Sequence, residues 1–121
     1  MAENSLSELR ESLLSAHKAL INDARAMYIS SGNKVPDPVA FWHLLIQDPF
    51  FQWLRPISEV IVALDEAKER SADFTLAQGI ALVREELIDE AGPELVEKLQ
   101  AARARDEKVD SAWARVLELV S

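Results

Sequence analysis

The sequence predicts an all-α protein, a single-domain helical bundle of about five to six helices with a long first helix and a proline-broken central segment. Two observations predict it. Apolar residues recur at spacings of three and four through most of the chain, as they do along one face of a helix. Helix-start signals, either a capping residue or an Asp-Pro pair, precede several of these stretches. The apolar run 60–64 could form a strand, but no second run offers it a partner.

Length and composition agree with one folded domain. A chain of 121 residues has the size of a single domain, with 49% apolar and 28% charged residues. We therefore expect residues 1–121 to form one helical domain, with residues 1–5 as a flexible N-terminus. The absence of cysteine excludes disulfides and thiolate sites. The acidic start resembles no secretion signal, and no apolar run is long enough to span a membrane, so we expect a cytoplasmic location.

The first helix is predicted to begin near Leu6 and to be the longest. Ser5 followed by Glu8 is a capping box. The helix should end at residues 31–33, because Gly or Asn there can adopt the left-handed conformation. One face carries the regularly spaced apolar residues Leu6, Leu9, Leu13, Ala16, Leu20, Ala24 and Met27. Leu14, His17, Ile21 and Tyr28 widen that face on one side.

Prolines shape the central segment. Asp37-Pro38 predicts the start of a short helix over residues 39–47, and Asp48-Pro49 predicts one or two helical turns up to residue 54. Pro56 should break or kink the chain there, because proline lacks an N–H donor. From Pro56 the apolar spacing predicts a helix with more than one apolar side, which is typical of a central element.

Three further helical segments complete the chain. Thr75 and Gln78 form a plausible capping pair before a helix whose apolar positions extend to Ile88. Gly92-Pro93 should end that helix and begin another, with Leu95, Val96, Leu99 and Ala102 as its inner face. Residues 101–108 could be a turn or continuous helix. The last helix is predicted over residues 109–120.

The charge distribution argues against nucleic acid and membrane partners. The formal net charge is −8, with −1 in residues 1–56 and −7 in residues 57–121. Neither half offers the cationic surface that binding to phosphates or anionic lipids requires.

The aromatic residues supply the main candidates for a binding site: Phe41, Trp42, Phe50, Phe51 and Trp53. Such residues fill small cores, and they also line ligand pockets or anchor partner proteins. Neighbouring helical residues point about 100° apart, so each adjacent pair cannot be buried completely. Trp42 and Phe51 are the residues expected to remain partly exposed.

Charged residues and histidines add weaker candidates. Arg55 could bind an anion, or it could cap carbonyl groups, stack on a tryptophan, or pair with Asp48 or Asp65. His17 and His43 lack the spacing of helical metal sites. The acidic residues between Glu85 and Glu97 could grip a cation, but a solvated helix face explains them. We find no catalytic motif, no cofactor fingerprint and no predicted metal site.

One stretch is similar to a motif of small bacterial helical proteins of unknown function. It reads Asp48-Pro49-x-Phe51-x-Trp53-Leu54-Arg55-Pro56-x-Ser58, followed by Ile61-Val62-x-x-Asp65-Glu66. The first helix, with its Ala-His-Lys-Ala-Leu core and Arg25-x-x-Tyr28, resembles theirs too. The resemblance covers roughly residues 10–70. It implies a helical fold and a bacterial cytoplasmic source, and it carries over no catalytic residue.

Three hypotheses of function follow. The first is a non-enzymatic protein-interaction domain, either a homo-oligomer or a small adaptor, because apolar helix faces and aromatics are abundant and catalytic constellations are missing. The second is a small-molecule or anion-binding protein with a pocket near Trp53, Arg55 and His43. The third is a metalloprotein with carboxylate and histidine ligands. The candidate binding residues are Trp42, His43, Phe51, Trp53 and Arg55.

Overall fold

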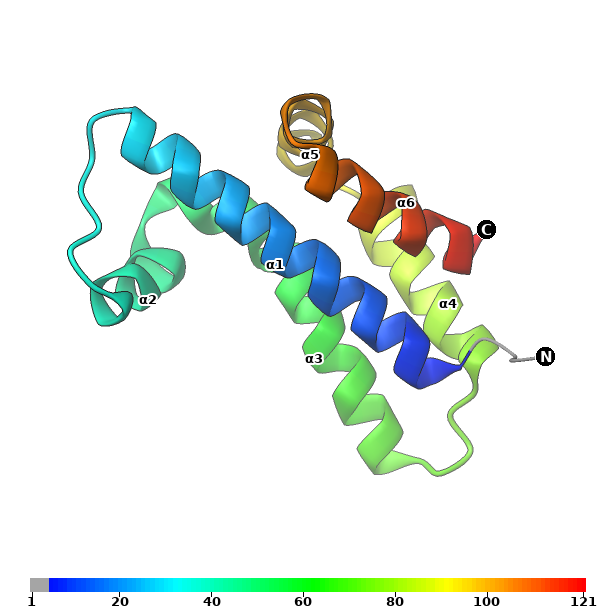
Figure 1. Cartoon of the computed structure of the whole chain (residues 1–121). Helices are drawn as coiled ribbons and strands as arrows, with labels where there is room; N and C mark the ends of the chain where they lie inside the picture. Colours follow the sequence, from blue (N-terminus) through cyan, green and yellow to red (C-terminus); the bar gives the residue numbers. More distant parts are fainter. Residues whose placement is uncertain (1–4) are drawn as a thin grey trace.

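The computed structural model describes residues 5–121, which form six α-helices and two short helical segments of other geometry, without a strand (Figure 1). This confirms the all-α prediction. The predicted flexible N-terminus, residues 1–5, lies mostly outside the described residues. Its last residue, Ser5, is the N-cap of the first helix, and its side chain accepts a hydrogen bond from the Glu8 amide at 3.1 Å.

Helix α1, Leu6–Ser30, has 25 residues and is the longest element, as predicted. At 1.5 Å per residue it extends about 37 Å. It packs against α6 along much of its length and also contacts α3 and α4. After its last turn the chain reaches Gly32, whose φ of 94° lies in the left-handed region that glycine tolerates. The predicted end of the helix is therefore confirmed.

A proline is the first residue of two of the next three elements and the second residue of the other. They are α2, Pro38–Gln47, the 3₁₀ segment η1, Pro49–Leu54, and α3, Arg55–Arg70. The side chains of Asp37 and Asp48 cap the first two by accepting amide hydrogen bonds. Pro56 stands in the first turn of α3, where a missing N–H costs nothing. Among the six α-helices, α2 alone has no fully buried side chain.

The second half of the chain begins with α4, Leu76–Arg84, which the predicted Thr75–Gln78 capping box starts. A π-helical turn, η2, Glu85–Asp89, extends it. Helix α5, Pro93–Arg105, begins at the predicted Gly92-Pro93 signal. The chain then breaks at Asp106, which caps α6, Glu107–Val120. Residues 101–108 therefore contain a break between two helices.

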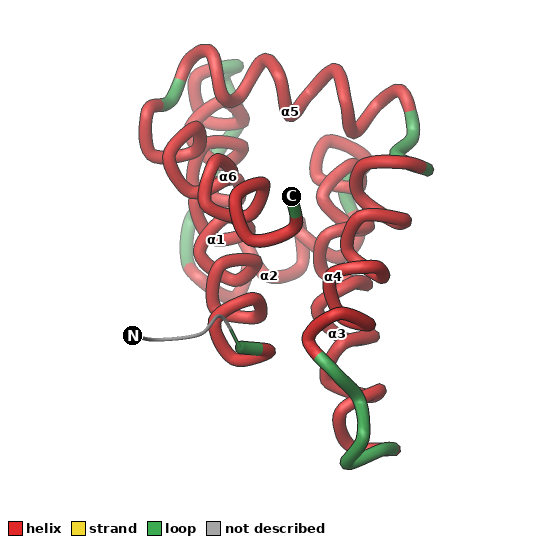
Figure 2. The backbone as a smooth tube through the Cα atoms, turned by 90° about the vertical axis from the view of Figure 1, so that its right-hand side faces the viewer, coloured by secondary structure: helices red, strands yellow, loops and turns green. Residues whose placement is uncertain are grey.

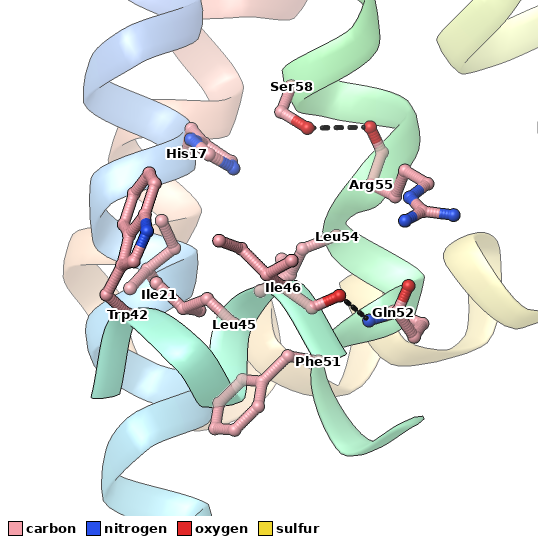
Figure 3. A pocket seen from close by; sticks show the side chains of 10 residues that line it. All are labelled: His17, Ile21, Trp42, Leu45, Ile46, Phe51, Gln52, Leu54, Arg55 and Ser58. Atoms are coloured by element: carbon pink, nitrogen blue, oxygen red, sulfur yellow. Dashed lines mark hydrogen bonds between the residues drawn. The ribbon is translucent and has the colours of Figure 1, made fainter. Parts of the chain in front are cut away.

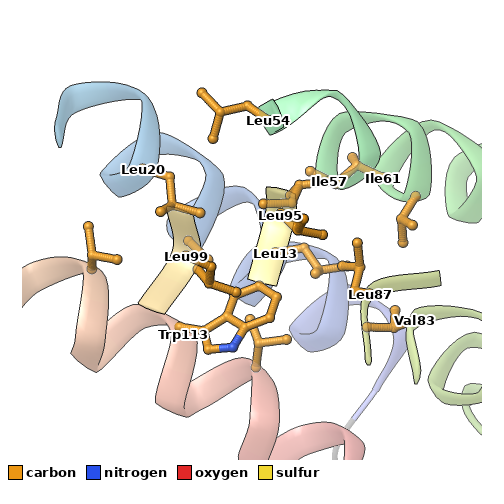
Figure 4. Packing of buried hydrophobic residues seen from close by; sticks show 14 of the residues in the cluster. Leu13, Leu20, Leu54, Ile57, Ile61, Val83, Leu87, Leu95, Leu99 and Trp113 are labelled. Atoms are coloured by element: carbon orange, nitrogen blue, oxygen red, sulfur yellow. The ribbon is translucent and has the colours of Figure 1, made fainter. Parts of the chain in front are cut away.

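The core lies between two pairs of helices. Helices α1 and α6 pack together on one side, α3 and α4 on the other, and α5 lies across one end of both pairs (Figure 2). Leu13 and Leu20 from α1 meet Ile57 from α3 and Trp113 from α6 in this core (Figure 4). Each is at most 3% exposed, and burying one such side chain contributes about 2 kcal/mol.

Four residues expected on inner faces are instead exposed. Leu14 is 37% exposed. Met27 is 37% exposed, Ile88 38% and Val96 41%. The π-helical turn explains Ile88: its hydrogen bonds join residues five apart, so the α-helical spacing no longer predicts which side chains share a face. On α5 only the narrow line of Leu95, Leu99 and Ala102 faces the core, which leaves Val96 outside.

None of the helices in residues 5–121 combines the length and the apolar character needed to cross a membrane.

Candidate functional site

A cavity of about 250 Å³ opens between α1, the α2–η1 segment and α3 (Figure 3). It brings together three of the five predicted binding residues, Trp42, Phe51 and Arg55. The full set of lining residues is His17, Ile21, Trp42, Leu45, Ile46, Phe51, Gln52, Leu54, Arg55 and Ser58.

The cavity is apolar on most sides and polar at one end. Ile21, Leu45 and Leu54 supply apolar walls, while His17 from α1 and Ser58 from α3 lie on opposite sides of the polar end, with the Ser58 hydroxyl turned toward the Arg55 carbonyl (Figure 3). The Ser58 hydroxyl donates a hydrogen bond to the Arg55 carbonyl at 2.9 Å. Burial lowers the pKa of His17 below its ordinary value, because a half-buried imidazolium loses hydration. Burial therefore favours the neutral imidazole.

Trp42 stands at the rim of the cavity and is 62% exposed. Val39 and Ile46, three residues before it and four after it, are 66% and 47% exposed. This spacing places the three side chains along one face of α2. The prediction that Trp42 remains exposed is confirmed. We call Val39, Trp42 and Ile46, together with the adjacent cavity, the α2 groove.

Phe51 lies at the floor of the cavity and is 1% exposed, so the prediction that it is partly exposed is wrong. Its ring centroid lies 5.1–5.6 Å from those of Tyr28, Phe41 and Phe50. Phe50 is the more accessible member of the adjacent pair. The 3₁₀ turn directs Phe51 inward against the end of α1, where its burial fixes η1 to the core.

Trp53 and His43 do not join this site. Trp53 is 6% exposed and faces the other side of η1, next to Met27 of α1 and Arg105 of α5. His43 is exposed and borders a separate shallow depression with Lys34 and Gln47. The predicted pocket shared by Trp53, Arg55 and His43 is therefore not formed.

Arg55 lies at the edge of the cavity, but its guanidinium group points away from His17 and Trp42 (Figure 3). It is 3.9 Å from Glu59, and both side chains are more than half exposed, so the pair contributes little. The predicted aspartate partners are engaged elsewhere. Asp65 pairs with Arg10 at 2.7 Å, and Asp48 accepts a hydrogen bond from the Phe50 amide.

The acidic residues between Glu85 and Glu97 are exposed, which agrees with a solvated surface. Within residues 5–121, no group of three or more histidine or acidic side chains is arranged to hold a metal ion.

No protein-family model matches the chain, and neither curated proteins nor solved structures give a significant match. The resemblance to small bacterial helical proteins therefore stays a prediction.

His17 lines the cavity, although its sequence position predicted only that it lies beside the core face of the first helix. Its spacing from Leu14 and Ile21 assigns it to the second apolar side of α1. A single histidine on such a face does not by itself indicate a cavity. The opposite wall is formed by residues of α2 and α3, and their position relative to α1 is a tertiary contact that the sequence pattern does not reveal.

Proposed function

We propose that this protein is a protein-interaction domain that binds a helical segment of another protein in the α2 groove. The observation that carries the proposal is the line of exposed apolar side chains on α2, directly beside a cavity that enters the helical body. Exposed tryptophan next to a pocket is typical of binding hot spots, where a few large side chains supply most of the affinity.

The size of the apolar surface favours a single helix as the partner. Trp42 alone leaves about 100–150 Å² exposed, since it is 62% exposed and an aromatic side chain offers about 150–250 Å². Val39 and Ile46 add to this surface at 66% and 47% exposure. A stable dimer buries about 800 Å² per partner, polar and apolar surface together, and these three side chains supply only part of that area. One amphipathic helix lying in a groove contributes anchors at the same spacing of three and four.

The small apolar surface of α2 favours the adaptor form of the interaction hypothesis over the homo-oligomer. The small-molecule hypothesis ranks second, because ligand pockets measure about 300–1,000 Å³ and this cavity is smaller.

The proposal is tested by selecting binders from a displayed library of amphipathic helical peptides. Selected peptides should bind the wild type one to one, and the variants Trp42→Ser and Ile46→Ser should weaken them at least tenfold. The control is Val96→Ser, which removes a side chain of similar exposure on α5 and should leave the affinity unchanged.

Two results would refute the proposal. One is a set of selected peptides that bind the Trp42→Ser variant as well as the wild type. The other is a concentration-dependent dimer in light scattering that Trp42→Ser dissociates, because the groove would then be filled by a second copy.

A further inference from the structure

His17 offers a hydrogen-bonding group to whatever enters the α2 groove. Within the described residues its imidazole makes no hydrogen bond, and it lies on a wall that is otherwise apolar. From this geometry we infer that the cavity is the anchor site for one aromatic side chain of the bound helix, a ring bearing an O–H or N–H group, either tyrosine or tryptophan. This inference rests on the proposed function and specifies the partner.

The volume of the cavity sets the size of the anchor. Liquid water occupies about 30 Å³ per molecule, so a cavity of about 250 Å³ has the space of about eight waters. That is enough for one ring system. Trp42, at the rim, can pack against the edge of an inserted ring, in the offset or edge-to-face arrangements that aromatic pairs prefer.

The chemistry of the polar end selects the substituent on the ring. A neutral imidazole has one donor and one acceptor nitrogen. Because burial disfavours protonation of His17, the acceptor nitrogen is available at neutral pH. The Ser58 hydroxyl already donates to the Arg55 carbonyl, so its oxygen can still accept. The polar end of the cavity therefore offers two acceptors and the imidazole N–H donor, so an O–H or N–H group on the ring finds an acceptor there.

A leucine or phenylalanine side chain would enter the same space and displace water from His17. It has no polar group to replace the hydrogen bond between that water and the imidazole. A net hydrogen bond is worth about 0.5–1.5 kcal/mol, so the donor-bearing ring should bind about 2- to 12-fold more tightly than its plain counterpart.

The test uses small mimics of the anchor, titrated into the labelled full-length protein and followed by NMR. The probes are p-cresol for tyrosine, 3-methylindole for tryptophan and toluene for phenylalanine. We expect saturable shifts at the Trp42 indole N–H and the His17 ring protons, with p-cresol binding about 2- to 12-fold more tightly than toluene.

Variants then assign the preference to His17. The His17→Leu variant should lose most of the preference for p-cresol over toluene, and the double variant His17→Leu/Ser58→Ala should lose all of it, because the Ser58 oxygen is the second acceptor. His17→Gln, which keeps a hydrogen-bonding side chain, should retain part of the preference. The matched control is His43→Leu, an exposed histidine outside the cavity, which should behave as the wild type. Equal affinities of the wild type for p-cresol and toluene, or shifts that map away from the cavity, would overturn the inference.

The peptide selection separates this inference from the proposed function. Peptides that depend on Trp42 but show no enrichment of tyrosine or tryptophan would overturn the anchor inference and leave the proposed function standing. If p-cresol binds the cavity but no helical peptide binds the protein, the proposed function fails and the cavity is a site for a free phenolic molecule.

Discussion

Replacing Arg105 by methionine should destabilise this protein more than breaking an exposed ion pair does. Asp23 of α1 is 5% exposed, and its carboxylate accepts three hydrogen bonds from the Arg105 guanidinium at 2.6–3.1 Å. These bonds raise the pKa of Arg105. Methionine keeps most of the apolar stem and removes the charge, so the variant leaves a buried carboxylate without its partner.

The expected cost can be estimated from the burial of the two groups. Breaking a fully buried ion pair costs about 3–5 kcal/mol, chiefly because the remaining charge is poorly solvated. The Arg105 side chain is 36% exposed, so water can reach part of the site after the replacement. We therefore expect a loss of about 2–3 kcal/mol, out of the total of about 5–15 kcal/mol that is typical of a domain.

Urea denaturation measures this loss as a lower midpoint with an unchanged slope. The control is Arg103→Met, which breaks an ion pair of similar length, 2.8 Å, with the exposed Asp110 and should cost less than about 1 kcal/mol. In the double variant Asp23→Leu/Arg105→Met no buried charge remains, so its loss should be smaller than the sum of the two single losses. Equal losses for the Arg103 and Arg105 variants, or additive losses in the double variant, would refute the reasoning.

Three further predictions concern single positions. Gly79→Val should cost about 1–3 kcal/mol, because even a Cβ there would lie 2.7 Å from Leu6 Cδ2 and the extra methyl groups overpack the contact of α4 with α1. Gly92→Ala, in open space, is its control, and thermal melting compares the two. Thr75→Ala removes the cap of α4 and should cost about 1 kcal/mol by urea denaturation, whereas Thr75→Ser should be nearly neutral. His17 should reduce stability in acid, because burial lowers its pKa and the unfolded chain binds the proton more readily. The free energy of unfolding should therefore fall as the pH drops below about 6.5, and less steeply in His17→Leu; parallel pH profiles for the two proteins would contradict this.

Local sequence signals predicted most of the fold. Ser5, Asp37 and Thr75 cap helices as expected, because capping depends on residues within one turn. The run at residues 60–64 is helical, as the lack of a strand partner implied. Local signals missed the π-helical turn that rotates Ile88 outward, since its hydrogen bonding depends on how the whole segment packs.

The site was predictable only in part. Because adjacent helical residues point in different directions, one aromatic of each pair was expected to be partly exposed. Trp42 is exposed and Phe50 is half-buried, in agreement with this expectation. Choosing between Phe50 and Phe51 requires the position of α1 relative to η1, which is a tertiary contact. The Asp23–Arg105 pair joins residues 82 positions apart, and no spacing rule connects them.

Helix α2 has a consequence for dynamics that follows from how it is held. No side chain of α2 is fully buried, and a segment with a left-handed glycine precedes it. Elements that bury little apolar surface open locally at a lower free energy than the core does. Amide hydrogens of α2 should therefore exchange with solvent faster than those of α1 or α6, and a ligand in the groove should slow that exchange. Part of the ligand's binding free energy would then be used to order α2. Mutations that rigidify this helix should therefore raise the affinity for the ligand without adding a contact.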